Sequence, residues 1–282
     1  MRRIFTILLS LCPLIIYASH AKMPPAVEGN PRLYPYPAES AKNTGIAVIV
    51  CPGGSYSWLD MKTEGDGVAK WLQQEGINAF VLRYHVANIS AYFLGYRVLG
   101  LGNKYPDMLT DIEEALAYVY NHAAEYNIDT ARIGVMGFSA GGHLTMSSFI
   151  YNKTPYKPRF LCPIYPVVTM SDQHLSHKRS RRGALGVWRQ FNKEMRDSLS
   201  LEKHITQDCP PVFLVNCKDD PVVRYQNSEM LDSALTAEHV RHLYIQYQTG
   251  RHGFGATPDK TTEEAIKWKD EFIKWIKTTL KI

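Results

Sequence analysis

The stretch IGVMGFSAGGHL, residues 133–144, decides the fold. Its first residues form an apolar run that predicts a buried strand, and residues 141–150 predict a helix directly after it. Between the two, GFSAG at 137–141 fits the pattern G-x-S-x-G, in which a sharp turn from strand to helix exposes a serine hydroxyl. The glycines leave room for the two close-packed segments. The pattern alone fits an ordinary turn equally well, so the meaning of Ser139 depends on partners elsewhere in the chain.

Strands and helices alternate along the chain from residue 45 onward. Continuous apolar runs predict the strands, and apolar residues at helical spacing predict the helices between them. The predicted strands are 46–50, 77–82, 132–136, 160–165, 211–217 and 242–248, and the predicted helices are 64–74, 106–126, 141–150, 227–235 and 262–280. This alternation predicts an α/β fold with a mostly parallel central sheet and helices on both faces.

Two long segments, residues 85–104 and 171–208, interrupt the alternation and carry several aromatic residues. Each follows a predicted strand, and ligands of open α/β sheets bind beyond the carboxyl ends of the strands. We therefore expect both segments to be pocket-wall insertions within one domain that spans residues 45–282.

The N-terminus has the features of an export signal. Two arginines precede an apolar run over residues 4–17, and small residues follow it. We expect a signal peptide over residues 1–21, a secreted or periplasmic mature protein, and no stable membrane insertion after its removal. The proline-rich residues 22–44 predict an extended arm, or a spacer, ahead of the domain.

The charge and composition of the chain do not indicate a nucleic-acid-binding protein. The 282 residues carry a net charge of +5, and the one basic cluster, residues 177–182, is typical of a solvated loop. The cysteines beyond the signal show no CxxC and no Cys/His metal spacing, which favours buried thiols over a metal site. An oxidising compartment would still permit a disulfide among them. These cysteines are Cys51, Cys162, Cys209 and Cys217.

A serine hydroxyl is a weak nucleophile at neutral pH and needs a base. His252 lies in the glycine-rich stretch TGRHGFG, where turns let the imidazole reach across the carboxyl ends of the strands. His143 lies four residues after Ser139 on the predicted helix, so its side chain points away from the serine and indicates a structural role. His252 is therefore the candidate base, against the alternative of an ordinary loop histidine.

The histidine in turn needs a carboxylate to fix its tautomer and stabilise its charged form. Asp219 and Asp220 both follow the predicted strand 211–217. Adjacent side chains cannot both point at one histidine, so we choose Asp220 and assign Asp219 to capping or solvent. The resulting order of serine, acid and histidine is the one associated with α/β-hydrolases.

Attack of a serine on an ester produces a negatively charged oxygen that backbone N–H groups can stabilise. The N–H of Ala140, directly after the serine, is one candidate donor. We expect the second from CPGGSY at 51–56, where Gly53 and Gly54 let the backbone approach closely. A glycine turn without such a role is the alternative.

These stretches together resemble the α/β-hydrolase superfamily. Within it, the chain resembles the secreted bacterial esterases described as acetylxylan-esterase-like lipase/esterases. The matching stretches run from about residue 45 to residue 277, and they are CPGGSY, GINAFVLRY, IGVMGFSAGGHL, PIYPVVTM, SLEKHITQDCPPVFL, DDPVVRYQNSEMLDSAL and GRHGFG. The resemblance implies a serine hydrolase of carboxylic esters, often acetyl groups on plant hemicellulose, without a metal or organic cofactor.

Three positions depart from the family pattern. Ser55 stands where many relatives have a third glycine, which concerns the geometry of that loop and not the three candidate residues. Arg224 stands where the family usually has proline. The run YFLGY at 92–96 is unusual and lies in an expected pocket wall, so the substrate does not transfer from relatives with a different wall.

We expect a serine esterase that removes acetyl, or feruloyl, groups from xylan-type hemicellulose fragments through an acyl-enzyme intermediate. Its partner would be a small-molecule or oligosaccharide ester. The alternatives are a serine peptidase on the same fold and a carbohydrate-binding member without activity. Four aromatic residues are expected to stack their rings on a sugar, although each could instead serve ordinary packing. They are Tyr56, Trp58, Tyr92 and Trp188.

Overall fold

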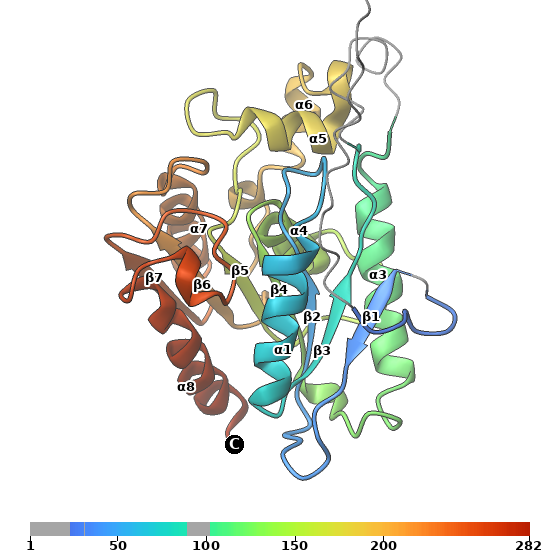
Figure 1. The fold of residues 1–282 in the computed structure, drawn as a ribbon. Helices are drawn as coiled ribbons and strands as arrows, with labels where there is room; N and C mark the ends of the chain where they lie inside the picture. The colour runs from blue at the N-terminus through green and yellow to red at the C-terminus, as the bar shows by residue number, and fades with distance from the viewer. Residues whose placement is uncertain (1–22, 31, 89–101) are drawn as a thin grey trace, which may run out of the picture.

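Runs of buried aliphatic residues form a seven-stranded sheet at the centre of the molecule (Figure 1). The structure is a computed structural model that describes residues 23–30, 32–88 and 102–282. Its strands are β1 (Leu33–Tyr36), β2 (Ala47–Cys51), β3 (Asn78–Leu82), β4 (Ile133–Phe138), β5 (Leu161–Ile164), β6 (Val212–Cys217) and β7 (His242–Tyr247). They lie in the order β1-β3-β2-β4-β5-β6-β7, and every neighbouring pair is parallel except β1 and β3. The mostly parallel sheet predicted from the sequence is confirmed.

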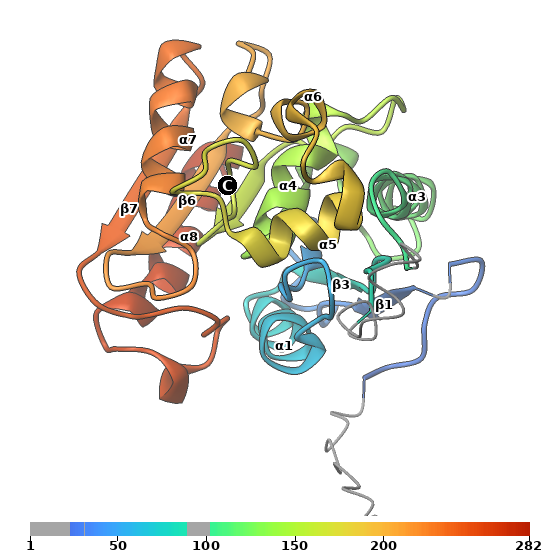
Figure 2. The ribbon, with the colours of Figure 1, turned by 90° about the horizontal axis from the view of Figure 1, so that it is seen from above.

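Helices cover both faces of this sheet, as predicted. Helices α1 and α8 pack on one face, and α3, α4 and α7 pack on the other. Figure 2 shows α1 and α3 on opposite sides of the strands. The helices are α1 (Gly67–Gln74), α3 (Asp107–Asn121), α4 (Ala140–Ile150), α5 (Lys178–Arg189), α6 (Lys193–Asp197), α7 (Gln226–Ala237) and α8 (Trp268–Leu280), and the π-helix η1 (Met61–Asp66) leads into α1. Because strands β2 to β6 are wholly buried between these layers, they are continuous apolar runs without alternation.

Strand β1 lies inside the segment 22–44 that the sequence predicted as an extended arm. It pairs antiparallel with β3 and forms one edge of the sheet. Pro35 lies within this strand, opposite Phe80. Proline lacks an N–H and is accepted in a strand only at such an edge.

The basic cluster predicted as a solvated loop is instead largely helical. Residues 178–182 form the start of α5, which is amphipathic: Ser180, Ala184 and Leu185 are buried, whereas Lys178 and Arg179 are exposed. The apolar residues that decide the helix follow the basic run, so the cluster alone did not indicate it.

Helices α5 and α6 form a cap over the carboxyl ends of the strands (Figure 1). The cap comes from the segment 171–208, and it packs directly on residues 52–58 after β2, which we call the β2 loop. An ideal Cβ built on Gly183 of α5 would lie 2.2 Å from the carbonyl oxygen of Ser55, so only glycine permits this contact. The other predicted wall, residues 85–104, lies mostly outside the described residues.

The four cysteines beyond the predicted signal are free and buried in this structure. Cys51 and Cys217 end β2 and β6, where burial raises the pKa of each thiol. Among the described residues, no helix combines the length and the apolar character needed to cross a bilayer.

Candidate active site

Ser139 occupies the turn between β4 and α4 in a strained conformation. Its φ of 55° and ψ of −116° lie outside the regions that L-residues favour, at a typical cost of about 1–3 kcal/mol. Two backbone hydrogen bonds, one to the last residue of β5 and one to the segment after it, hold it there. The N–H of Ser139 donates to the carbonyl of Ile164 at 3.0 Å, and the N–H of Val167 donates to the carbonyl of Ser139 at 3.1 Å.

The two glycines that flank this serine are required by close backbone approach. An ideal Cβ at Gly137 would lie 2.2 Å from the carbonyl oxygen of Gly141. One at Gly141 would lie 2.0 Å from the carbonyl oxygen of Cys51, at the end of β2. The pattern G-x-S-x-G therefore lets the start of α4 approach both the preceding strand and the β2 loop.

The structure brings together the three residues predicted to act as nucleophile, base and acid. The Oγ of Ser139 lies 2.9 Å from Nε2 of His252, and Nδ1 of the same ring lies 2.6 Å from Oδ2 of Asp220. With Nδ1–H donating to the carboxylate, Nε2 is left as an acceptor for the serine hydroxyl. The serine comes from the β4–α4 turn, Asp220 from the loop after β6, and the histidine from residues 248–255 after β7, which we call the histidine loop.

The structure distinguishes the two adjacent carboxylates. The side chain of Asp220 is buried, and besides binding His252 it accepts hydrogen bonds from the N–H groups of Val222 and Val223 through Oδ1, at 2.8 and 2.9 Å. The carboxylate of Asp219 instead accepts the N–H of Arg251 at 2.8 Å. The choice of Asp220 as the partner of the histidine agrees with this geometry, and Asp219 braces the same loop from the backbone.

The two predicted glycine donors of the β2 loop have different surroundings. The N–H of Gly53 donates to Oε2 of Glu64 at 2.7 Å, so it is not available to a substrate. Among the described residues, the N–H of Gly54 has no acceptor, and Ala140 begins α4, where an N–H lacks a helical partner. The loop runs beside the serine, because an ideal Cβ on Gly53 would lie 3.0 Å from Cβ of Ser139. The pair of donors that the geometry supports is therefore Gly54 and Ala140.

Glu64 is a feature of this site that sequence reasoning missed. The residue is 3% exposed, and its carboxyl group accepts hydrogen bonds from the N–H of Gly53 at 2.7 Å and from the hydroxyl of Tyr165 at 2.9 Å. Burial raises the pKa of Glu64 to about 7, although the charge of His252 works in the opposite direction. One signal was present: Glu64 precedes Val68 by four residues, which places it on the buried stripe of the predicted helix.

His143 has the structural role that its position predicted. Its Nε2 lies 2.8 Å from the carbonyl oxygen of Leu199, and its Nδ1 lies 2.8 Å from the hydroxyl of Tyr56. Nε2 carries the proton, since a carbonyl can only accept, and Nδ1 accepts from the tyrosine. Burial lowers the pKa of His143 to about 4. This histidine thereby ties α4 to the β2 loop and to the segment after α6.

The four aromatic residues expected to meet a sugar lie in different surroundings. Tyr56 is 1% exposed and hydrogen-bonded to His143, so it offers no ring face and the expectation for it is corrected. Trp58 and Trp188 are 45% and 68% exposed, on the β2 loop and on α5 of the cap. Tyr92 lies outside the described residues.

His177, just before α5, is a second residue that the sequence did not single out. Its Nδ1 lies 2.8 Å from Oγ of Ser180, and burial, followed by the nearby charge of His252, lowers the pKa of His177 to about 4. A neutral imidazole of the cap therefore lies within electrostatic range of His252 at pH 7.

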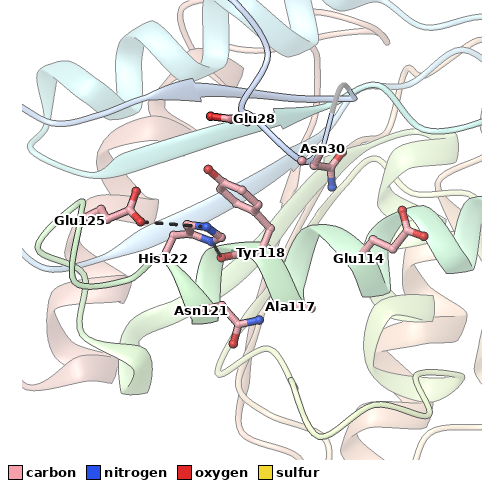
Figure 3. Close-up of a pocket in the computed structure, with 9 residues that line it drawn as sticks. Glu28, Asn30, Glu114, Ala117, Tyr118, Asn121, His122 and Glu125 are labelled. Carbon is pink, nitrogen blue, oxygen red and sulfur yellow. Dashed lines mark hydrogen bonds and ion pairs between the residues drawn. The ribbon is translucent and has the colours of Figure 1, made fainter.

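A separate pocket lies on the α3 side of the molecule (Figure 3). Glu28, Glu114 and Glu125 line it together with the stacked rings of Tyr118 and His122. It contains none of the candidate site residues. In the part of the chain that the structure describes, no group of three or more His, Cys, Asp or Glu side chains could hold a metal ion.

The sheet order, the serine at the strand-to-helix turn, and the order of serine, acid and histidine define an α/β-hydrolase. Known proteins place it more narrowly. The BD-FAE family matches residues 34–235, and the chain belongs to this family. Within this family the chain is similar to acetylxylan esterases.

Individual relatives agree with this assignment. The chain is 34% identical over 224 residues to an acetylxylan esterase of Xylanibacter ruminicola, covering 75% of this chain and 42% of that protein. It is 30% identical over 224 residues to endo-1,4-beta-xylanase B of Butyrivibrio fibrisolvens, covering 76% and 33% of the two chains. The chain thus spans less than half the length of these curated relatives.

Among solved structures, an acetyl ester-xyloside bifunctional hydrolase from Caldicellulosiruptor lactoaceticus superposes with a TM-score of 0.74. That protein is 30% identical, and the match covers 87% of each chain. A carboxylesterase from Lactobacillus plantarum, 18% identical with a TM-score of 0.70 over 87% of this chain and 92% of that one, shares the fold.

Proposed function

We propose that this protein is a serine esterase that removes acetyl or feruloyl groups from xylan-type hemicellulose fragments. The observation that carries the chemistry is the pair of hydrogen bonds that join Ser139 to His252 and His252 to Asp220, at 2.9 and 2.6 Å. The names of the relatives, an acetylxylan esterase and an acetyl ester-xyloside hydrolase, support the choice of substrate.

In the proposed reaction, Oγ of Ser139 attacks the ester carbonyl carbon while Nε2 of His252 takes its proton. The carboxylate of Asp220 holds the ring and stabilises the imidazolium that forms. The N–H groups of Gly54 and Ala140 donate to the oxygen that becomes negative, and one such donor typically contributes about 10²–10³ in rate.

Collapse of the tetrahedral intermediate breaks the ester bond, and His252 gives its proton to the departing sugar oxygen, which leaves as a hydroxyl group. A water molecule then attacks the acyl group on Ser139, with the same imidazole as base, and the carboxylic acid leaves. Every proton transfer in this sequence passes through Nε2 of one histidine. Trp58 and Trp188, both exposed, are the proposed contacts for the sugar rings.

The proposal is tested by comparing the mature protein on p-nitrophenyl acetate and on an aminoacyl chromogenic amide. Ester hydrolysis that disappears in Ser139→Ala supports the proposed chemistry. Activity on the amide alone would indicate a peptidase, and activity on neither would indicate a binding protein. Release of acetate and ferulate from native xylan oligosaccharides, measured by mass spectrometry, then identifies the acyl group.

The predicted signal peptide at residues 1–21 leads us to propose that the protein acts outside the cytoplasm, in the periplasm or the medium. Hemicellulose fragments are encountered there. Fractionation of the producing cells, with N-terminal sequencing of the mature protein, tests this location and the cleavage site.

A further inference from the structure

The carboxyl group of Glu64 lies between the β2 loop and the histidine loop. It is held by two hydrogen bonds, from the N–H of Gly53 at 2.7 Å and from the hydroxyl of Tyr165 at 2.9 Å. Tyr165 follows β5 and has a φ of 37°, and its hydroxyl also accepts the N–H of Gly255 at 2.9 Å. Three segments far apart in the sequence therefore meet at one buried carboxyl–hydroxyl pair.

Helix η1 fixes the peptide that presents the Gly54 N–H. Glu64 holds the N–H of Gly53, and the N–H of Asp60 donates to the carbonyl of Gly53 at 2.9 Å. That carbonyl shares its planar peptide unit with the N–H of Gly54, which must point the opposite way. The direction of the Gly54 N–H is thus set by contacts on both sides of Gly53.

The same pair acts on the histidine. The ring of Tyr165 lies with its centre 4.7 Å from that of His252. Its hydroxyl accepts the N–H of Gly255, three residues after the histidine, and Asp219 accepts the N–H of Arg251, one residue before it. The histidine loop is therefore fixed along the chain on both sides of His252. Glu64 is also near enough for the charge of His252 to favour its ionised form.

We infer that Glu64 and Tyr165 are positioning residues that fix the Gly54 N–H and the His252 imidazole in the right position relative to each other. This inference rests on the proposed function, because it assigns a role in stabilising the charged oxygen of ester hydrolysis. Neither side chain hydrogen-bonds to Ser139 or to the imidazole of His252. Both act through backbone groups of the two loops, and loss of either one shifts the donor relative to the base.

The test compares Glu64→Ala, Glu64→Gln and Tyr165→Phe with the wild type. The chain offers a matched control on the same helix. The hydroxyl of Tyr36 donates to Asp66 of η1 at 2.9 Å, in a second buried tyrosine–carboxyl pair that lies at β1 and not at the two loops. Tyr36→Phe therefore removes the same kind of bond without touching the proposed function.

The measurements are kcat and KM on p-nitrophenyl acetate, normalised to the serine titrated by an organophosphate, and the inhibition constant of phenylboronic acid. The boronate forms a tetrahedral anion on the serine and reports on the donors directly. We expect Tyr165→Phe and Glu64→Ala to lower kcat about 10–100-fold, as a displacement near 1 Å does, with KM within about threefold. Boronate affinity falls by a similar factor. Glu64→Gln, whose amide oxygen still accepts from Gly53, recovers part of the loss.

Tyr36→Phe is expected to lower the melting temperature while kcat and boronate affinity stay within twofold of the wild type. The inference is overturned if Tyr165→Phe keeps the wild-type kcat per titrated serine, or if kcat falls with no change in boronate affinity. Should Glu64→Ala fail to fold, Tyr165→Phe and Glu64→Gln decide the matter. Ester hydrolysis by the wild type and by Ser139→Ala is measured in parallel. If the wild type does not hydrolyse the ester, the proposed function fails, and this result is distinct from a failure of the positioning role.

Discussion

Asp219 and Asp220 are neighbours in the sequence, and both hold the histidine loop, but through different atoms. Asp220 binds the imidazole of His252 at 2.6 Å, whereas Asp219 binds the backbone N–H of Arg251 at 2.8 Å. One carboxylate therefore sets the tautomer of the histidine, and the other sets the path of the chain that carries it.

Replacing these two acids separates the two roles. Asp220→Asn is expected to lower kcat about 10³–10⁴-fold, because an amide at this position favours the wrong tautomer of the histidine. Asp219→Asn keeps an oxygen that accepts from Arg251, so its kcat is expected to stay within a fewfold of the wild type. Steady-state kinetics on p-nitrophenyl acetate measures both, and full activity in Asp220→Asn would contradict the assignment.

The strained backbone of Ser139 predicts a gain in stability when the residue is replaced by glycine. Ser139→Gly and Ser139→Ala both remove the nucleophile and are expected to abolish ester hydrolysis. Glycine accepts a φ of 55° without strain, so Ser139→Gly is expected to exceed Ser139→Ala by about 1 kcal/mol in the free energy of unfolding. Urea denaturation of the two inactive variants measures the difference, and equal stabilities would show that the strain is absent.

Gly54→Ala is expected to disturb the β2 loop and lower kcat about 100-fold or more. An ideal Cβ there would lie 1.9 Å from the carbonyl oxygen of Trp58, and φ is already positive at 138°. Gly29→Ala serves as the control, since its φ of 79° is also positive but no atom lies within 4 Å of the added Cβ. Kinetics and melting curves of both variants are compared. A wild-type kcat in Gly54→Ala would argue against Gly54 as a donor.

The buried imidazole of His143 predicts acid sensitivity. Its pKa falls from an ordinary value of 6.5 to about 4 in the folded protein, so between these values the unfolded chain binds more protons than the folded one. Stability from this group is present above pH 6.5 and is lost as the pH falls toward 4, by on the order of 3 kcal/mol. His143→Gln is expected to show a smaller loss than the wild type between pH 7 and 4.5, measured by urea denaturation.

Trp188 provides a test of substrate contact by the cap. Its side chain is 68% exposed, so Trp188→Ala removes little buried surface and is expected to leave the melting temperature nearly unchanged. We expect KM for acetylated xylan oligosaccharides to rise about threefold to tenfold, with kinetics on p-nitrophenyl acetate unaffected. Equal KM values for the oligosaccharide in both proteins would remove Trp188 from the proposed sugar contacts.

The alternation of apolar runs and helical stripes was sufficient to predict the parallel sheet, both helical layers and the place of Ser139. Chain order then pointed to Asp220 and His252, because the carboxyl ends of parallel strands meet at one edge. The role of Gly53 was not predictable, because its N–H donates a hydrogen bond to Glu64, and no local pattern in the sequence pairs these two residues. Tyr56 was unpredictable for a similar reason, since its burial depends on contacts with α4 and α5 that no local pattern encodes.

The contact between Gly183 and Ser55 limits which sequence changes in the cap can alter substrate selectivity without also affecting the active site. Cap segments are often regarded as modules that can be exchanged while the reaction centre stays constant. Here the cap rests on the carbonyl of the very loop that carries Gly54, at a distance that admits no side chain. A transplanted or shortened cap would therefore alter turnover along with preference. New selectivity is more readily acquired by changes on the outward side of α5, around Trp188, while Gly183 remains glycine.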